Sequence, residues 1–170
     1  MAVEIFQVTQ NAPHIIEAIA GLHENYFVGH LGWESSFVKD IGHDLEDFTT
    51  RLHLDGNGLW VAISEKDIIG SIIIDNKDYG PESARIRLFI VDSSFCNQGI
   101  DQHLMGHAVA FCEKNGYKSI LLWTFETLHA AKAIYLRHGF QMVDEREVDY
   151  WGNHLCEQLF GMDLNHDIVE

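Results

Sequence analysis

The stretch that decides the fold runs from residue 84 to residue 104 and reads ARIRLFIVDSSFCNQGIDQHL. Residues 84–91 are rich in β-branched and apolar side chains and predict a strand, whereas apolar residues from Ile100 onward recur at helical spacing. A turn containing Gly99 joins the two. Such a junction directs unpaired backbone N–H groups and the positive end of a helix dipole at one point. The stretch therefore predicts a strand, a turn and a helix with a ready site for an anionic phosphate.

The rest of the chain predicts a mixed α/β domain that covers residues 1–170. Gly29 and Gly32 are expected to break the first helix, and Gly116 and Gly139 to end two later ones. The predicted elements, in chain order, are a strand over 4–9, a helix that starts at Asn11-Ala12-Pro13, a helical segment over 33–54, a hairpin of strands 58–64 and 68–74, the strand 84–91, a helix over 98–115, a strand over 119–124, a helix over 128–138, and strands over 141–148 and 154–164.

Composition excludes several classes of protein. Twenty-six acidic against eleven basic side chains give a net charge of −15, which argues against a nucleic-acid binder because phosphate contacts need a basic surface. No apolar run approaches the ~20 residues of a membrane helix, and the N-terminus lacks the regions of a signal peptide. Three scattered cysteines are too few for a disulfide framework and favour free thiols in a cytoplasmic protein.

A second motif, AKAIYLRHGF at residues 131–140, follows about 30 residues after the first. Together the two segments resemble the GNAT N-acetyltransferase family, whose acetyl-CoA loop reads Arg/Gln-x-x-Gly-x-Gly/Ala and whose later helix ends in Tyr-x-x-x-Gly-Phe. The resemblance extends over residues 21–164 to the branch of GNAT domains often fused behind winged helix-turn-helix regulators. The residues that carry this finer resemblance are Phe27, Gly32-Trp33, Leu121-Leu122-Trp123-Thr124 and Trp151-Gly152-Asn153-His154-Leu155.

The resemblance implies the GNAT acyl-CoA N-acyltransferase fold, a mixed central sheet with a splayed pair of strands flanked by helices. Acetyl-CoA would lie between the strands 86–91 and 119–124, with its thioester carbonyl near the backbone amide of Phe89 or Ile90, where a donor stabilises a developing oxyanion. Tyr135 would act as the general acid for the leaving thiolate. The cofactor-binding residues that the resemblance implies are Phe89, Ile90, Val91, Asn97, Gln98, Gly99, Ile100, Asp101, Gln102 and His103.

The loop departs from the family pattern at three positions. Cys96 stands in place of Arg or Gln, Asn97 in place of a common glycine, and Asp101 in place of Gly or Ala. A carboxylate in the first helical turn favours the helix dipole, could cap the free amides, and would repel a diphosphate. Residues 93–113 contain no Lys or Arg to compensate. The sequence therefore predicts weak CoA binding.

The acceptor side is less well defined by sequence. Trp33, Arg87 and Trp123 are candidate substrate-binding residues, although tryptophans in a small domain are usually core. Arg87 either binds a carboxylate of the acceptor or forms a salt bridge to a neighbouring strand. Glu34, Glu126 and a water chain are the alternatives for the general base.

The sequence gives little support for a metal site or for a reactive cysteine. His103 and His107 have the spacing of a His-Glu-x-x-His site but Leu104 replaces the glutamate, so no metal is predicted. Cys96 precedes a helix, an environment that can activate a thiol, although an ordinary loop cysteine is the preferred interpretation.

The leading hypothesis is an N-acetyltransferase that moves acetyl from acetyl-CoA to a primary amine of a small molecule, peptide or protein, with a homodimer as an open alternative to a monomer. A second hypothesis is a GNAT-fold domain with a degraded CoA loop that acts as a non-catalytic binding or regulatory module. A third is a binder of another CoA thioester or a nucleotide.

Overall fold

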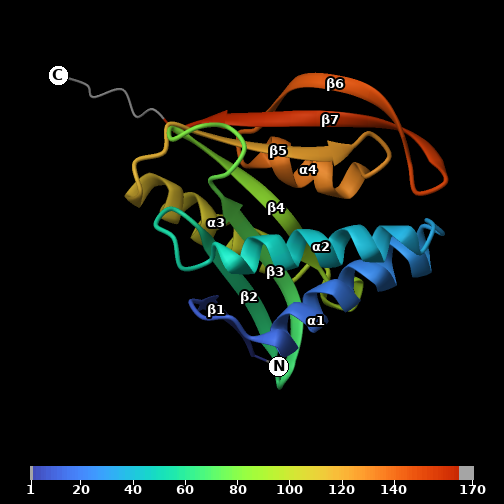
Figure 1. Cartoon of the computed structure of the whole chain (residues 1–170), viewed down its shortest axis with the longest axis horizontal. Helices are drawn as coiled ribbons and strands as arrows, with labels where there is room; N and C mark the ends of the chain where they lie inside the picture. The colour runs from blue at the N-terminus through green and yellow to red at the C-terminus, as the bar shows by residue number, and fades with distance from the viewer. Residues whose placement is uncertain (1, 165–170) are drawn as a thin grey trace.

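The computed structural model of the protein describes residues 2–164, and these form one mixed sheet with the strand order β1-β2-β3-β4-β5-β7-β6 (Figure 1). The strands are β1 (Val3–Val8), β2 (Gly58–Ser64), β3 (Asp67–Asp75), β4 (Ser83–Val91), β5 (Ser119–Phe125), β6 (Gln141–Tyr150) and β7 (Asn153–Asp163). The helices are α1 (Pro13–His23), η1 (Glu24–His30), α2 (Ser36–Thr50), η2 (Ser93–Phe95), α3 (Ile100–Lys114) and α4 (His129–Arg137). The predicted mixed α/β fold is confirmed.

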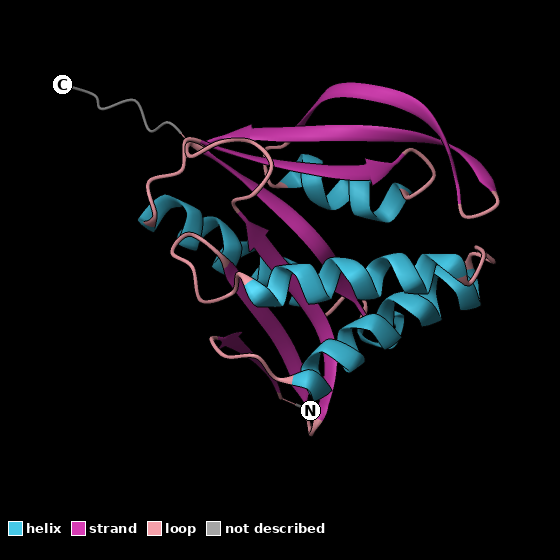
Figure 2. Ribbon diagram, in the orientation of Figure 1, coloured by secondary structure: helices cyan, strands magenta, loops and turns pink. Residues whose placement is uncertain are grey.

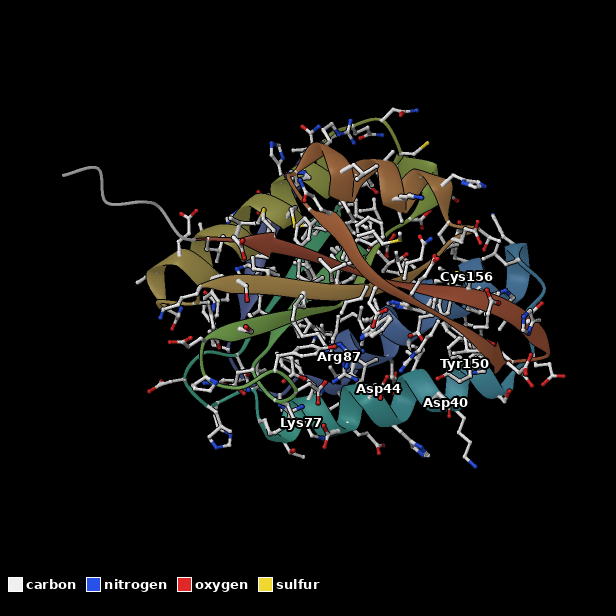
Figure 3. The ribbon with its side chains drawn as sticks, turned by 90° about the horizontal axis from the view of Figure 1, so that it is seen from above. Asp40, Asp44, Lys77, Arg87, Tyr150 and Cys156 are labelled. Atoms are coloured by element: carbon white, nitrogen blue, oxygen red, sulfur yellow. The ribbon has the colours of Figure 1, made fainter. Side chains whose placement is uncertain are left out.

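Helices cover both faces of the sheet. On one face α1 and α2 lie side by side (Figure 2), and their apolar side chains pack with Leu59, Val61 and Ile73 of β2 and β3. On the other face α3 packs on the opposite side chains of the same strands, such as Ala62 and Ile72, and α4 contributes Ile134 and Tyr135 to the same apolar cluster. Seen from above, α2 and α4 lie on opposite sides of the sheet (Figure 3). Successive side chains of β2 and β3 point to opposite faces and are buried on both, so the sheet lies between two separate cores.

The sheet divides between β4 and β5. These parallel strands pair only over three residues each, Ser83–Arg85 with Ser119–Leu121. Beyond that point β4 stays with β3, and β5 follows β7. The predicted splayed pair is therefore confirmed, and an opening forms between the carboxyl ends of two strands in the middle of the sheet.

A bulge in β4 lies at the edge of this opening. The register of β3 against β4 shifts between Ser71 and Ile73, so Leu88 and Phe89 have no partner residue in β3. Leu88 has a φ of +48°, an uncommon conformation for a branched side chain, and the Ser71 hydroxyl donates a 2.7 Å hydrogen bond to its carbonyl oxygen. Gly70 is needed here, because a Cβ would lie 3.0 Å from the Ile90 carbonyl oxygen.

One boundary differs from the sequence prediction. The first helix does not break at Gly29 but continues as the π-helix η1, and the chain turns at Gly32, where φ is +73°. A helix wound more widely projects its side chains in new directions and is frequent at functional sites. The effect here is to direct Tyr26 and Phe27 toward the opening between β4 and β5.

Candidate active site

The opening between β4 and β5 is a cavity of about 750 Å³. Its walls come from both faces of the sheet: α1, η1 and α2 on one side, and the start of α3 and α4 on the other. A volume of this size is typical of a small-molecule or cofactor site. The cavity brings together ten of the residues singled out from the sequence: Arg87, Phe89, Ile90, Val91, Asn97, Gly99, Asp101, Gln102, Trp123 and Tyr135.

The floor of the cavity is the backbone of β4. Leu88 and Phe89 have no partner in β3 because of the bulge, and none in β5 because the strands have separated. The Leu88 carbonyl oxygen accepts the Ser71 hydroxyl, and the other main-chain groups here, which lack a strand partner, are able to bond an extended ligand as an added strand would. They also include N–H donors that could face a developing oxyanion.

The turn before α3 holds a second set of free donors. Asn97 and Gly99 both have positive φ, +63° and +76°, and the first hydrogen bond of α3 runs from the His103 amide to the Gly99 carbonyl. The amides that precede His103 in the helix therefore have no helical acceptor. Of the other residues expected here, Gln98 and His103 are exposed, Ile100 is buried in the core, and their side chains do not line the cavity.

Asp101 does not cap these amides, contrary to one expectation from the sequence. Its carboxylate lies 3.7 Å from the Arg137 guanidinium at the end of α4, and both residues line the cavity. Arg137 thus supplies the cation that residues 93–113 lack. Arg137 belongs to the motif 131–140 that the sequence analysis identified. No local sequence pattern indicates that the end of α4 lies against the start of α3, so the pairing of Arg137 with Asp101 could not be predicted.

Tyr135 reaches the cavity from α4 and is only 7% exposed. Its ring lies 6.1 Å from that of Phe89 and 6.0 Å from that of Phe160. Its hydroxyl has no hydrogen-bond partner among residues 2–164. Burial raises the pKa of Tyr135 above its usual value, so the hydroxyl stays protonated at neutral pH and is a donor.

Arg87 is held in a network of ion pairs on the α2 side of the cavity (Figure 3). Its guanidinium donates to the Asp75 carboxylate at 2.9 Å and lies 3.1 Å from the Asp44 carboxylate. Arg51 donates to the same Asp75 at 2.6 and 2.9 Å. Burial alone would raise the pKa of Asp75, but the hydrogen bonds from both arginines hold it below its usual range. The sequence left open whether Arg87 binds a carboxylate of the acceptor or forms a salt bridge to a neighbouring strand. The structure shows the salt bridge, to Asp75 of β3.

The tryptophans divide between core and cavity. Trp33 is 5% exposed, stacks on Trp151 at 5.1 Å and does not line the cavity. Trp123 lines it, with its indole N–H donating to the Tyr79 hydroxyl at 2.8 Å and the Arg146 guanidinium 4.4 Å above its ring. This part of the cavity is thus aromatic, with Tyr26, Phe27 and Phe37 on the opposite wall.

Neither glutamate proposed as general base lines the cavity. Glu34 is exposed and donates its amide to the Trp151 carbonyl, and Glu126 is also exposed. The titratable residues on the cavity wall that sequence reasoning missed include Glu157, which is paired with Arg146 at 2.8 Å, and the buried His23. His23 follows Ile19 by four residues, which is the spacing of any residue on the buried face of a helix. The sequence therefore did not indicate a functional role for His23.

Other reactive groups lie apart from this arrangement. Over residues 2–164 no three side chains are placed to hold a metal ion, and no helix is long and apolar enough to cross a membrane. The three cysteines are free, Cys96 is exposed, and burial raises the pKa of Cys112 to about 12.

The comparison with known families decides the assignment. The model described as the acetyltransferase (GNAT) family matches residues 19–140, which include the end of α1, the β4 bulge, the α3 turn and Tyr135. The chain belongs to the GNAT family. The finer resemblance to domains fused behind winged helix-turn-helix regulators stays a prediction.

Curated relatives of this GNAT chain are N-acetyltransferases. N-acetyltransferase 8 of Mus musculus is 27% identical over 128 residues, 73% of this chain and 56% of that protein. N-acetyltransferase 8 of Rattus norvegicus is 29% identical over 128 residues, 73% of this chain and 58% of that one. The chain therefore matches little more than half the length of these relatives.

Solved structures share the fold. A GNAT acetyltransferase of Staphylococcus aureus MU50 has a TM-score of 0.79 at 17% identity, covering 96% of this chain and all of that one. The yncA protein of Salmonella typhimurium, solved with its cofactor acetyl-CoA, has a TM-score of 0.77 at 12% identity and covers 100% of this chain and 98% of its own. These likenesses establish the GNAT fold for this chain.

Proposed function

We propose that this chain is an N-acetyltransferase that moves the acetyl group of acetyl-CoA to a primary amine of a small molecule or peptide. The observation that carries the proposal is that three features meet at one cavity: the divergence of β4 and β5, the bulged backbone at Leu88 and Phe89 that has no strand partner, and the buried hydroxyl of Tyr135. Family membership supports the reaction class. The Salmonella typhimurium neighbour with its cofactor acetyl-CoA supports the acyl donor.

Each part of the cavity has a role in this scheme. The amides before His103, together with Arg137, bind the diphosphate, and the exposed backbone of β4 binds the extended arm of the donor. The amide of Phe89 or Ile90 donates to the thioester oxygen as negative charge develops on it. Tyr135 gives its proton to the sulfur as the carbon–sulfur bond breaks.

The non-catalytic binding module receives less support. That hypothesis rested on a carboxylate in the phosphate-binding turn with no cation beside it, and Asp101 instead has Arg137 as a partner. A binder of another CoA thioester or of a nucleotide would use the same turn but would not need the buried Tyr135 hydroxyl. The predictions of one domain over residues 1–170, a cytoplasmic location and a homodimer belong to the same proposal.

The test is turnover of the wild-type protein. Acetyl-CoA is mixed with a panel of primary amines such as benzylamine, tryptamine and a lysine-containing peptide, and release of the free CoA thiol is followed by a thiol reagent. We expect release that depends on at least one amine and an N-acetylated product by mass spectrometry. Binding of acetyl-CoA without amine-dependent release across the panel would contradict the proposal.

A further inference from the structure

His23 is a buried histidine that the scheme above does not use. It is the last residue of α1, is 3% exposed and lies on the wall of the cavity. Its Nδ1 lies 2.8 Å from the carbonyl oxygen of Ile19, one helical turn earlier. Because a carbonyl oxygen only accepts, Nδ1 carries the proton and donates this hydrogen bond. The tautomer is thereby fixed.

The second ring nitrogen, Nε2, is left with a free lone pair. It has no hydrogen-bond partner among residues 2–164, and it is not sealed from the cavity as a fully enclosed, unpaired atom would be. An unpaired polar atom in a buried side chain costs stability unless something else bonds to it. The cavity is the place from which that bond partner would come.

His23 and Tyr135 stand on opposite faces of the sheet. Ile19, one turn before His23, packs in the apolar cluster that includes Leu88 of the β4 bulge, and the Phe27 ring stacks 6.1 Å from the His23 ring. Tyr135 belongs to the other cluster, with α3. A thioester held at the bulge between them would present one side to His23 and its sulfur side to Tyr135.

We propose that His23 Nε2 accepts the proton of the attacking amine, a role that rests on the proposed acetyl transfer. The amine nitrogen bonds to the thioester carbon, the carbon–sulfur bond breaks, and the amine proton passes to Nε2. The sulfur takes its proton from Tyr135. Both side chains return to their resting forms by exchange with solvent, so the products are the N-acetylated amine and the free CoA thiol.

The environment of the ring suits this role. Burial lowers the pKa of His23 to about 4, and the hydrogen bond to Ile19 only partly opposes this. The ring is therefore neutral at pH 7 and able to accept a proton. A weak base suffices, because the nitrogen that has attacked the thioester carries positive charge and is a much stronger acid than a free alkylammonium.

The first test is the His23→Gln variant, whose amide still forms hydrogen bonds but cannot hold a proton. We expect kcat to fall about 100-fold, with the KM for acetyl-CoA unchanged within about twofold. His14→Gln is the matched control, because His14 lies exposed on the first turn of the same helix and should leave kcat unchanged. If His23→Gln folds and transfers acetyl with the kcat of the wild type, His23 is not the proton acceptor and this proposal is overturned. The proposed acetyltransferase function would still stand.

A second measurement does not depend on turnover. Ring ¹⁵N spectra of wild-type protein loaded with CoA, with the His23 ring assigned through bonds from its own backbone resonances, should show protonated Nδ1 and bare Nε2 at pH 7. Benzylamine should then shift the Nε2 signal and leave the signals of exposed histidines in place. A protonated Nε2 at pH 7 would overturn the proposal, and so would an Nε2 chemical shift that does not change when amines are added. Both outcomes can be observed even if the variant fails to fold. Loss of all turnover in the wild type contradicts the proposed function instead.

Discussion

The two halves of the cavity are built in different ways. The main-chain half, from Leu88 to Gln102, offers backbone groups left unpaired by a bulge and by the start of a helix. The side-chain half, formed by α1, η1, α2 and the aromatic residues facing them, offers rings and charges, of which Arg87 is already paired with Asp44 and Asp75 whereas His23 has one free ring nitrogen. The position of a backbone N–H donor depends on the backbone conformation rather than on the identity of the side chain. The main-chain half can therefore tolerate Cys96, Asn97 and Asp101 where the family has other residues.

The largest expected effect concerns the side-chain half. Asp75→Asn removes the carboxylate that Arg51 and Arg87 share, leaving two largely buried guanidinium groups without their common counter-charge. We expect the free energy of unfolding to fall by about 3 kcal/mol or more, measured by urea denaturation at pH 7. Asp78→Asn breaks the more exposed pair with Arg85 and should cost less than about 1 kcal/mol. Equal small losses would mean that the network does not shape the cavity.

The buried neutral His23 predicts a specific loss of stability in acid. Below its ordinary pKa of 6.5 the unfolded chain takes up a proton at this ring, whereas the folded protein does not until about pH 4. Stability therefore falls as the pH is lowered through this window, by about 2 kcal/mol between pH 7 and pH 5 from this group. Urea denaturation at both pH values should show a smaller drop in His23→Gln than in wild type. Identical drops would mean that the ring titrates normally.

Tyr135→Phe separates the role of the acidic proton from that of packing at the α4 side of the cavity. The ring and its contacts with Phe89 remain, and only the acidic proton is lost. We expect kcat to fall about 100-fold with nearly unchanged affinity for acetyl-CoA, measured by steady-state kinetics and calorimetry. If kcat is unchanged, Tyr135 is a packing residue. Phe160→Leu, in the core beside the same ring, separates a loss of packing from a loss of the proton.

A smaller effect is expected at the ion pair of Asp101 and Arg137. Asp101→Ala removes a negative charge from the phosphate-binding turn and frees Arg137, so CoA should bind up to about tenfold more tightly, whereas Arg137→Ala should weaken binding by a similar factor. Both effects should shrink in high salt. Lys114→Ala, at the far end of α3, is the control for net charge. Weaker binding of CoA by Asp101→Ala would show that the carboxylate orders the turn.

Sequence reasoning worked where local pattern determines structure. Period-two and helical spacing gave the strands and helices, and Gly99 with Tyr135-x-x-x-Gly139-Phe140 placed the two motifs that meet at the cavity. It did not give features that arise from tertiary contacts. Nothing in the sequence near Leu88 signals a positive φ, and the pairing of Asp101 with Arg137 depends on how α3 and α4 dock.

The acceptor side shows the same limit. Trp33 and Arg87 have the chemistry of substrate-binding residues, but packing places Trp33 in the core and ion pairs occupy Arg87. His23 has the spacing of a core residue, and only the position of α1 against the β4 bulge brings it to the cavity. Side-chain sites assembled from distant elements are therefore harder to predict than backbone sites within one strand–turn–helix unit.

Acetyl-CoA is expected to bind in the opening between β4 and β5 through backbone groups. Calorimetric titration of the wild-type protein with acetyl-CoA tests it most directly, with thermal unfolding as a parallel readout. We expect one molecule bound per chain and a rise in the melting temperature that saturates with the same dissociation constant. No heat of binding and no change in melting temperature at millimolar acetyl-CoA would contradict it.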